Sequence, residues 1–493
     1  MAGREGLWTA ERRALTIGLI LTITFVAAEA LAVATVMPLV ARDLRGLNLY
    51  GFVFSAFMLG TLVGIVAAGR AADRNGPALP YIAGLVIFAA GLLVSGLATS
   101  MPMLVGGRAL QGIGAGAVPA VAYTAIGRSL PEHLRASMMA MMSTAWVAPG
   151  LIGPAISAEV AHLFGWRWVF LGLIPFIAVT GPFAIPALVR LGRPETRARD
   201  GHRLADGVGL AITAGLVLTG LTLLAGSGAS GGSGAQSAAA TGGLTATLLT
   251  GPAAVISGTV MIVVGGVGVV LVLRRLLPDG TLTARSGLPA TVLVRGLVTF
   301  GFYGADAFVT LTVTILRQHS ALVAGVAVTC NTVAWAAGSW IQARLHARWT
   351  ERRLIRVGVI ILLAGTAGLA VMLSDRVPVA EGIAAWTVAG LGMGMCYGPI
   401  TLLMLKRAPA GREGWASASL NVADVLGSAM GIGVGGAMIS AAVSFGGSLA
   451  AGLAIAFGCA AAASGLALAV SRRLPVTDGG PAAQPDVSEL TAA

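Results

Sequence analysis

Long apolar stretches, separated by short polar ones, recur along the whole chain. A stretch of about 20 apolar residues is long enough for a helix to cross the hydrocarbon core of a membrane. A helix satisfies its own backbone hydrogen bonds in lipid, and these stretches lack the alternation of membrane-barrel strands. We therefore predict an all-α polytopic membrane protein with fourteen transmembrane spans: 14–40, 50–70, 79–99, 102–126, 137–162, 167–190, 204–225, 248–273, 289–316, 321–345, 354–373, 381–405, 415–441 and 446–471.

Composition agrees with this pattern. The 493 residues are 56% hydrophobic and 11% charged, whereas about 25% of the residues of a soluble domain are charged. The net charge of +12 comes from arginines beside the apolar stretches, which favours the positive-inside rule over a nucleic-acid partner. Most of these arginines precede the first span or follow an even-numbered one. We therefore expect both termini in the cytoplasm and the chain in the cell membrane, the inner membrane of a bacterium.

The chain shows no signature of an enzyme or of a bound cofactor. Its three cysteines lie inside apolar stretches, and its five histidines have no metal-ligand spacing. Its Gly-x-Gly strings also lie in apolar stretches, with no P-loop among them, so ATP-driven transport by this chain alone is not expected. We predict no catalytic residue, no metal and no cofactor.

An internal repeat divides the chain. Gly112, Gly114 and Gly116 reappear as Gly390, Gly392 and Gly394, at an offset within about 274 to 280 residues that other motifs share. Parallel six-helix repeats are a transporter architecture, with the substrate between the halves near the midplane. The predicted organisation is a cytoplasmic segment 1–13, a six-helix half 14–190, loops and two extra helices 191–288, a second six-helix half 289–471 and a disordered cytoplasmic tail 472–493. The extra helices, 204–225 and 248–273, flank a flexible outside loop at 226–247.

Among the ionisable residues inside predicted spans, four stand out: Glu29, Arg108, Asp306 and Asp424. Such residues are costly in a membrane and point to function, although each can instead be a paired structural group. A carboxylate in a low-dielectric cavity holds a proton more readily. A cationic substrate then competes with that proton for the same group, which is the physical basis of antiport.

Other motifs carry weaker functional signals. A loop with Gly69, Asp73, Arg74 and Gly76 joins spans 2 and 3, and span 5 contains Pro149, Gly153 and Pro154. Pro154 lacks an N–H and is expected to kink its helix, which packing alone can also explain. Tyr123, Trp146, Phe302, Tyr303, Asn331 and Trp335 are possible pocket residues, although an aromatic residue alone is more often part of the core or of the membrane-interface belt.

Together these motifs resemble the major facilitator superfamily, in its branch of fourteen-helix drug:proton antiporters. The resemblance rests on the loop Gly69 to Gly76, the span 4 string Arg108-Ala-Leu-Gln111-Gly112-Ile-Gly114, Gly153-Pro154 in the antiporter motif of span 5, Glu29 followed by Pro38 in span 1, and Gly165-Trp166-Arg167-Trp168-Val169-Phe170 before span 6. It covers about residues 14 to 471.

The chain departs from the family pattern at several positions. Pro77-Ala78 follows the loop motif where basic residues are usual, and Ala347 takes the place of its acid in the second half. Span 1 has Glu29 for an aspartate and Leu31 for a threonine, and span 5 has Pro149 for a glycine and Ser157-Ala158 for a closing Gly-Gly. These departures affect the expected substrate range more than the expected fold.

The resemblance implies a monomeric transporter that exports small amphipathic compounds in exchange for protons. It places Glu29, Arg108 and Asp306 on a central cavity and span 13, with Asp424, at the seam between halves. Glu29 is the first choice of proton carrier and Asp306 the second, with the proton as coupling ion and a small molecule and the bilayer as partners. Export of an endogenous lipid or secondary metabolite stays open, and so does a non-transporting membrane sensor or scaffold.

The loop at Gly69–Gly76 is expected to act as a latch. It lies at the cytoplasmic surface, far from a midplane substrate site. Asp73 is hypothesised to dock at the positively charged N-terminus of span 13 near Trp415, with Arg74 near Glu413. Such a contact biases the equilibrium between access states without binding substrate.

Overall fold

A computed structural model describes residues 7–9, 12–130, 134, 138, 141, 145, 147–192, 204–226, 251–346, 348–408 and 413–475. Several predicted features lie outside these residues. They are residues 227–247 of the predicted outside loop, most of the tail 472–493, Trp146 and the side chains of Tyr123, Asp73 and Glu413. The described elements are all helical: α1 (Arg13–Asp43), η1 (Leu47–Leu49), α2 (Tyr50–Asn75), α3 (Ala78–Gly96), α4 (Met101–Ser129), α6 (Val147–Phe164), α7 (Arg167–Leu171), α8 (Ile174–Arg190), α9 (Leu204–Gly226), α12 (Gly251–Leu276), α13 (Leu288–Leu311), η2 (Thr312–Leu316), α14 (Ala321–Leu345), α15 (Glu351–Gly368), η3 (Leu369–Leu373), α16 (Val379–Arg407), α17 (Glu413–Ser444), α18 (Leu449–Val470) and η4 (Ser471–Arg473).

Within the described residues, twelve helices are long and apolar enough to cross a membrane. They are the segments Arg13–Asp43, Leu47–Ala72, Ala78–Gly96, Arg167–Arg190, Ala205–Ala225, Ala254–Leu276, Leu288–Leu316, Ala321–Leu345, Glu351–Leu373, Val379–Arg407, Ala418–Ser444 and Leu449–Arg473. α4 and α6 are not among the twelve, but both pack inside the same bundle, α4 against α2 and α3 and α6 against α1 and α14. The protein is therefore a multi-pass membrane protein, and the predicted count of fourteen spans stays a prediction.

Local sequence signals set several helix ends. Gly76 ends α2 with a φ of 83°, and Gly165 separates α6 from α7 with a φ of 89°, conformations that glycine adopts without a steric penalty. The hydroxyls of Ser320, Thr350 and Ser448 cap α14, α15 and α18 by accepting a hydrogen bond from a backbone N–H in the first turn.

The helices before α9 and those after α12 pack in the same pattern. α4 lies against α2 and α3, as α16 lies against α14 and α15. α1 contacts α6 and α8, as α13 contacts α17 and α18. Between these two sets, α2 packs on α17 and α6 packs on α14. The first set is called the N half below and the second the C half.

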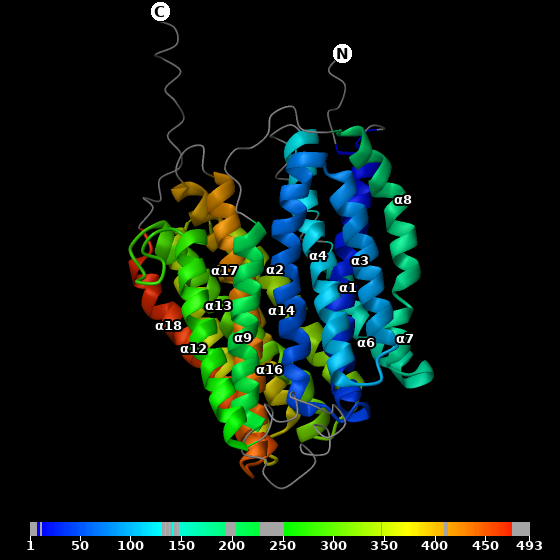
Figure 1. Ribbon diagram of the computed structural model, residues 1–493. Coiled ribbons are helices and arrows are strands. Elements are labelled where there is room, and N and C mark those ends of the chain that lie inside the picture. The colour runs from blue at the N-terminus through cyan, green and yellow to red at the C-terminus, as the bar shows by residue number, and fades with distance from the viewer. Residues whose placement is uncertain are drawn as a thin grey trace, which may run out of the picture.

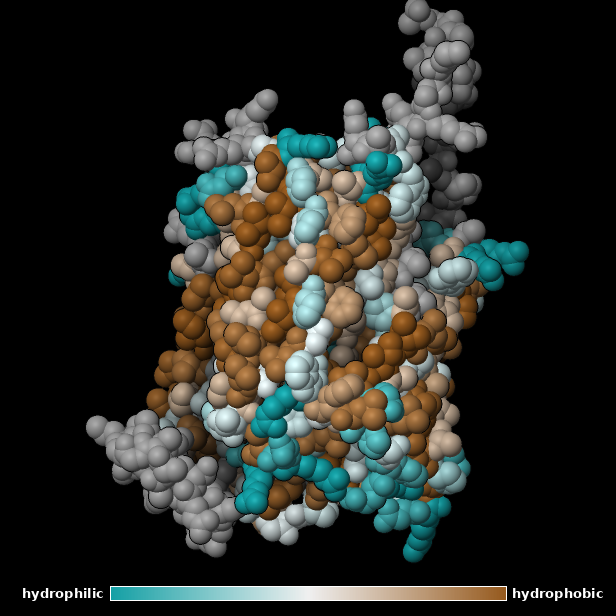
Figure 2. All heavy atoms as spheres, turned by 90° about the vertical axis from the view of Figure 1, so that its right-hand side faces the viewer, coloured by the Kyte–Doolittle hydropathy of each residue, from teal (hydrophilic) through white to brown (hydrophobic). Residues whose placement is uncertain are grey.

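α9 and α12 form a pair outside the two halves, and α9 packs on α2 and α17, one helix from each half (Figure 1). The other faces of this pair are apolar and exposed, and only 11% of the residues in the membrane-spanning stretch of α12 are buried. The view of Figure 2 shows the same property on another side of the bundle, where hydrophobic side chains cover most of the middle and hydrophilic ones gather near both ends. Such a belt fits a helix bundle surrounded by lipid.

The start of α1 and the end of α18 lie at one end of the bundle, which is called the terminal end here (upper end in Figure 1). The halves meet closely towards the opposite, far end. Ser55 donates a hydrogen bond to the carbonyl of Ala429 at 3.0 Å, and the hydroxyls of Tyr50 and Thr310 lie 3.3 Å apart. A Cβ built on Gly51 lies 2.8 Å from the Cα of Gly436. Small residues thus permit a close approach between the halves at this end.

Apolar packing between the two halves is also concentrated at the far end. One large cluster includes buried residues from the far-end parts of α1 and α2 and from the whole C half. A second cluster, which includes Leu15, Tyr81 and Leu188, occupies the terminal end of the N half. At the far end the two halves therefore share one core.

Candidate functional site

A buried ion pair lies at the centre of the N half. Arg108 Nη1 donates to Glu29 Oε1, and it donates to Gln111 Oε1 at 2.6 Å. Glu29 has no exposed surface and Arg108 is 2% exposed. The guanidinium carbon of Arg108 also lies 4.2 Å from the ring centroid of Phe57. The pair is thus isolated from water, where attraction between opposite charges is strong.

The hydrogen bonding of this site is incomplete. Glu29 Oε2, Arg108 Nε and Gln111 Nε2 are buried and have no hydrogen-bond partner among the described residues. Unsatisfied buried polar atoms are costly, and they need a physical explanation such as a functional strain or an unseen water or ion. Three such atoms in one cluster make it the strongest candidate in the N half for binding a proton or a ligand.

Residue spacing and small residues on α4 explain how the polar groups of this site come together. Arg108 and Gln111 are three residues apart and so share one face of α4. The glycines of α4 let its neighbours approach, because a Cβ on Gly112 would lie 2.0 Å from the carbonyl oxygen of Phe57 on α2. On the α3 side, a Cβ on Gly114 would lie 2.5 Å from the carbonyl oxygen of Gly84. The glycines of α4 therefore allow the close packing that holds this helix in place.

The C half has an ion pair of its own, between Arg295 of α13 and Asp424 of α17. Arg295 Nε donates to Asp424 Oδ1 at 2.7 Å, and Tyr397 of α16 donates its hydroxyl to Asp424 Oδ2 at 3.2 Å. The guanidinium lies over the ring of Tyr397, 3.1 Å from its centroid. The side chain of Asp424 is 18% exposed, so this pair is less completely buried than Glu29 and Arg108.

Asp306 differs from the other three ionisable residues. It is partly exposed, and it makes no hydrogen bond or ion pair with any residue of the described chain. Tyr303 of the same helix and Tyr50 of the N half lie close enough to interact with its charge. Asp306 is thus a carboxylate at membrane depth, near the contact between the halves, without an ion-pair partner in the described chain.

An aromatic cluster surrounds this part of the C half. Tyr303, Trp335 and Tyr397 are partly exposed and contact one another, with ring centroids 6.5 Å apart for Tyr303–Trp335 and 5.4 Å apart for Trp335–Tyr397. Phe302 is only 2% exposed and stacks on the buried Trp386 at 5.0 Å, so it supports the cluster from behind. Partly exposed aromatic faces near two carboxylates suit a lipophilic cation.

Asn331, a predicted pocket residue, lies in the packing between α14 and α16. Its side chain is 4% exposed and donates to the carbonyl of Trp386 at 2.9 Å. That hydrogen bond occupies the side-chain amide of Asn331 within the C half and holds Trp386 in position.

The motif of span 5 lies at the contact between α6 and α14. Pro154 is inside α6 and its Cβ lies 3.2 Å from the position of a Cβ on Gly325. A Cβ on Gly150 would lie 2.3 Å from a methyl carbon of Thr332, whereas a Cβ on Gly153 would meet nothing within 4 Å. Pro149 is buried. The motif thus combines a proline within the helix with close contact to the other half.

The loop motif between α2 and α3 lies at the terminal end. Arg74 is exposed, Gly76 adopts a φ of 83° and a Cβ on Gly69 would meet nothing within 4 Å. The proposed contacts of Asp73 with the start of α17, and of Arg74 with Glu413, involve side chains outside the described part of the chain. The latch therefore stays a prediction.

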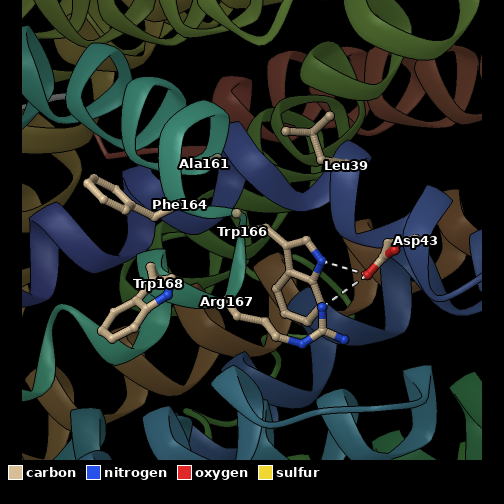
Figure 3. Close-up of a pocket in the computed structure, with 8 residues that line it drawn as sticks. Leu39, Asp43, Ala161, Phe164, Trp166, Arg167 and Trp168 are labelled. Atoms are coloured by element: carbon tan, nitrogen blue, oxygen red, sulfur yellow. Dashed lines mark hydrogen bonds and ion pairs between the residues drawn. The ribbon is translucent and has the colours of Figure 1, made fainter.

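A pocket of about 440 Å³ lies at the far end, beside α1, α6 and α7. Figure 3 shows how Trp166 and Arg167 both point to Asp43, with Trp166 Nε1 at 2.8 Å and Arg167 Nη1 at 3.3 Å from Asp43 Oδ2. Arg167 also donates to the carbonyl of Ala98 at 3.2 Å. The Gly165 to Phe170 motif therefore connects α1, α7 and the end of α3 at this corner, and it lies away from the Glu29 site.

Sequence patterns did not identify three residues of the central region: Tyr397, Trp386 and Tyr50. Tyr397 lies in the same apolar span as the repeated glycines, and the only sequence signal for it is a polar hydroxyl at membrane depth. No group of three or more His, Cys, Asp or Glu side chains in the described residues is arranged to hold a metal ion. The three cysteines are free thiols, with Cys396 buried.

Comparison with known proteins gives the family. The model of the Major Facilitator Superfamily matches residues 16–432. A probable multidrug-efflux transporter of Mycobacterium tuberculosis is 26% identical over 444 residues, which cover 88% of this chain and 89% of the relative. A multidrug transporter protein of Bacillus subtilis is 32% identical over a shorter region, 32% of this chain and 30% of the relative.

Solved structures share the fold at low sequence identity. A POT family transporter in complex with 5-aminolevulinic acid has a TM-score of 0.63 and 14% identity, covering 94% of this chain and 96% of that structure. The human organic anion transporter MFSD10 has a TM-score of 0.57 and 15% identity, covering 93% and 99%. With its paired halves and a family match over most of its length, the chain belongs to the Major Facilitator Superfamily.

Proposed function

We propose that the protein exports small amphipathic compounds, lipophilic cations among them, in exchange for protons. The observation that carries this proposal is the pair of carboxylates at membrane depth, Glu29 and Asp306, on helices of opposite halves. Its multidrug-efflux relatives support the direction of transport and the class of substrate. No cofactor is needed, because the proton supplies the driving force, about 2.3 kcal/mol per charge for each 100 mV.

Glu29 is the proposed proton carrier and Asp306 the second candidate. A proton on Glu29 removes the negative charge that balances Arg108, and an uncompensated buried charge is costly. Protonation of Glu29 therefore favours a conformation in which Arg108 finds another partner or reaches water. A change of helix packing driven in this way links proton binding to alternating access.

Asp306 and the aromatic faces of Tyr303 and Trp335 are the proposed contacts for a cationic substrate. The carboxylate has no competing partner in the described chain, Tyr303 lies near it on the same helix, and the partly exposed ring of Tyr303 contacts that of Trp335. Binding of a cation at Asp306 then opposes binding of a proton there.

The proposal includes a topology. All fourteen predicted spans cross the cell membrane, α4 and α6 included, since both pack among the membrane-spanning helices. The terminal end carries most of the arginines and is placed in the cytoplasm by the positive-inside rule. On this topology the far end faces the outside, and the core that the halves share there supports a state closed on that side.

A proton-exchange assay in everted membrane vesicles tests this function. Addition of ethidium, a lipophilic cation, to energised vesicles is expected to release protons from the vesicle interior. Glu29→Gln is expected to abolish that release. Glu159→Gln is the matched control, because Glu159 is an exposed carboxylate on α6 and should leave the exchange intact. Normal exchange in Glu29→Gln would overturn the assignment of the proton carrier.

A further inference from the structure

A second pocket lies at the terminal end, in the loop between α12 and α13. Its volume is about 340 Å³, and it is lined by Leu273, Arg274 and the run from Leu277 to Thr283. In Figure 1 the loop after α12 and the end of α18 lie side by side at the left of the bundle. This pocket is separate from the Glu29 and Asp306 sites, which lie within the membrane-spanning part.

The loop that forms the pocket has a defined shape. Thr281 donates its hydroxyl to the carbonyl of Pro278 at 2.6 Å, and the N–H of Arg285 donates to the carbonyl of Gly280 at 2.9 Å. Gly280 has a φ of 85°, and a Cβ there would lie 2.8 Å from the Cβ of Arg285. Only glycine therefore lets the stem of Arg285 pack against the floor of the loop.

Contacts from other helices hold the loop in place. Arg473, the last residue of η4, donates from Nη1 to the carbonyls of Thr283 at 2.9 Å and Ala284 at 3.2 Å. Ser419 of α17 donates to the carbonyl of Leu276 at 2.9 Å. The pocket is thus preformed, so a ligand does not have to order it on binding.

Positive charge gathers around this pocket. Arg274 and Arg275 lie in the last turn of α12, Arg285 follows in the loop and Arg473 contacts the loop from η4. All four are exposed. The only acidic residue in the run from Leu277 to Gly287 is Asp279. Guanidinium groups bind phosphate oxygens with two parallel hydrogen bonds, so the chemistry of this surface fits a phosphate group.

The pocket adjoins the end of the candidate membrane span Ala254–Leu276, where lipid headgroups are expected. The outward face of α12 that leads to it is apolar and exposed, with Val260, Val263, Val264, Val267 and Leu271 each more than half exposed. Leu282, 46% exposed, adds an apolar side chain to the pocket lining. An acyl chain can therefore lie along α12 while its headgroup reaches the arginines.

We propose that this pocket binds the headgroup of an anionic phospholipid of the adjacent leaflet, with Arg274 of the pocket lining as the first phosphate ligand and its exposed neighbour Arg275 as the second. The proposal gives the pair α9–α12 a role, because α9 packs on one helix from each half. A lipid bound at the end of α12 anchors this pair to the membrane surface beside the seam between the halves.

Lipid binding by the purified full-length protein in mild detergent tests the proposal. The probe is a fluorescent phosphatidylglycerol, with fluorescent phosphatidylcholine as the zwitterionic comparison. Arg274→Gln/Arg275→Gln is expected to weaken phosphatidylglycerol binding about 25-fold, at about fivefold for each arginine. Arg190→Gln, which removes an exposed arginine at the terminal end of α8, is the matched control and should leave binding unchanged.

Three results would overturn the proposal: equal binding by the double variant and the native protein, no preference of the native protein for phosphatidylglycerol over phosphatidylcholine, or displacement of the lipid by millimolar inorganic phosphate. The last result would assign the pocket to a soluble anion. Arg274→Lys/Arg275→Lys retains the charge and should bind within about threefold of the native protein. Normal elution of each variant as a single species in gel filtration shows that the fold is kept.

Discussion

The two halves of the molecule place different residues at equivalent positions. In the N half, Glu29 on α1 pairs with Arg108 on α4. Asp306 follows Glu29 by 277 residues and Trp386 follows Arg108 by 278, which is also the offset between Gly112 and Gly390. The carboxylate is thus present in both halves, whereas its arginine partner is replaced by a tryptophan in the C half.

This replacement changes what each carboxylate can do. Glu29 is held by a charge-assisted hydrogen bond in a dry site, so uptake of a proton by Glu29 is coupled to loss of its ion pair with Arg108. Asp306 has no such partner in the described chain and stays partly exposed. Trp386 instead stacks on Phe302, one turn before Asp306. One fold therefore carries a paired carboxylate and an available one at the same depth.

The buried arginine of the C half, Arg295, does not lie at the position equivalent to Arg108. Arg295 is eleven residues before Asp306 on α13, which places it about 16 Å nearer the terminal end. There it pairs with Asp424 and Tyr397, while the equivalent region of the N half has Gly18 packed against Ala184. Charge in the C half is thus balanced near the terminal end and left unbalanced at the depth of the proposed substrate site.

The largest expected effect comes from breaking the N-half pair. Arg108→Ala leaves the carboxylate of Glu29 buried and unpaired, and it should lower the free energy of unfolding by about 3–5 kcal/mol. Denaturation in detergent measures this loss. In Glu29→Gln/Arg108→Gln no charge stays buried, so most of the stability should return. A double variant as unstable as Arg108→Ala would contradict an ion pair as the cause.

Breaking the C-half pair should lower the free energy of unfolding less than breaking the N-half pair. Asp424→Asn removes the charge but leaves Arg295 over the ring of Tyr397, and the expected loss is about 1–3 kcal/mol. Tyr397→Phe removes only the hydroxyl that donates to Asp424, at about 0.5–1.5 kcal/mol. The same denaturation experiment measures both losses. A cost for Asp424→Asn equal to that for Arg108→Ala would remove the contrast between the halves.

The loop motif also differs between halves, because Asp73 has Ala347 as its counterpart. In the C half, Lys406 of α16 donates instead to the buried carboxylate of Glu351 at the start of α15. Asp73→Asn removes a charge that is proposed to dock at a helix N-terminus, a contact of about 0.3–2 kcal/mol. Turnover should fall several-fold while the substrate concentration for half-maximal transport stays unchanged. A large loss of affinity at normal turnover would refute the latch.

The smallest expected effect on stability is at Asp306. Because this carboxylate has no ion-pair partner in the described chain, Asp306→Asn should change the free energy of unfolding by no more than about 0.5 kcal/mol. Transport of ethidium should nevertheless weaken markedly, while a neutral substrate is affected less. Fluorescence assays in reconstituted liposomes compare the two substrates. A loss of stability as large as that of Asp424→Asn would reveal a partner for this group.

Much of the fold was predictable because membrane helices follow a strong local rule. The apolar stretches gave the helix positions, and the glycines of α4 and α16 indicated close packing, which the structure confirms at Gly112 and Gly114. Glu29, Arg108, Asp306 and Asp424 were recognisable because charged residues are rare at membrane depth. Their partners were not, since Arg295 and Asp424 are far apart in sequence and meet only through the packing of α13 on α17.

Sequence alone determined that this is a helical membrane protein of two repeated halves, because hydrophobicity and the repeat are properties of the chain itself. Only the tertiary structure decided which of its intramembrane charges are neutralised. Helix periodicity sets the face on which a side chain lies, but the partner across that face depends on how helices pack. For this reason Phe302 and Asn331 were predicted as pocket residues and lie buried, while Asp306 has no partner in the described chain.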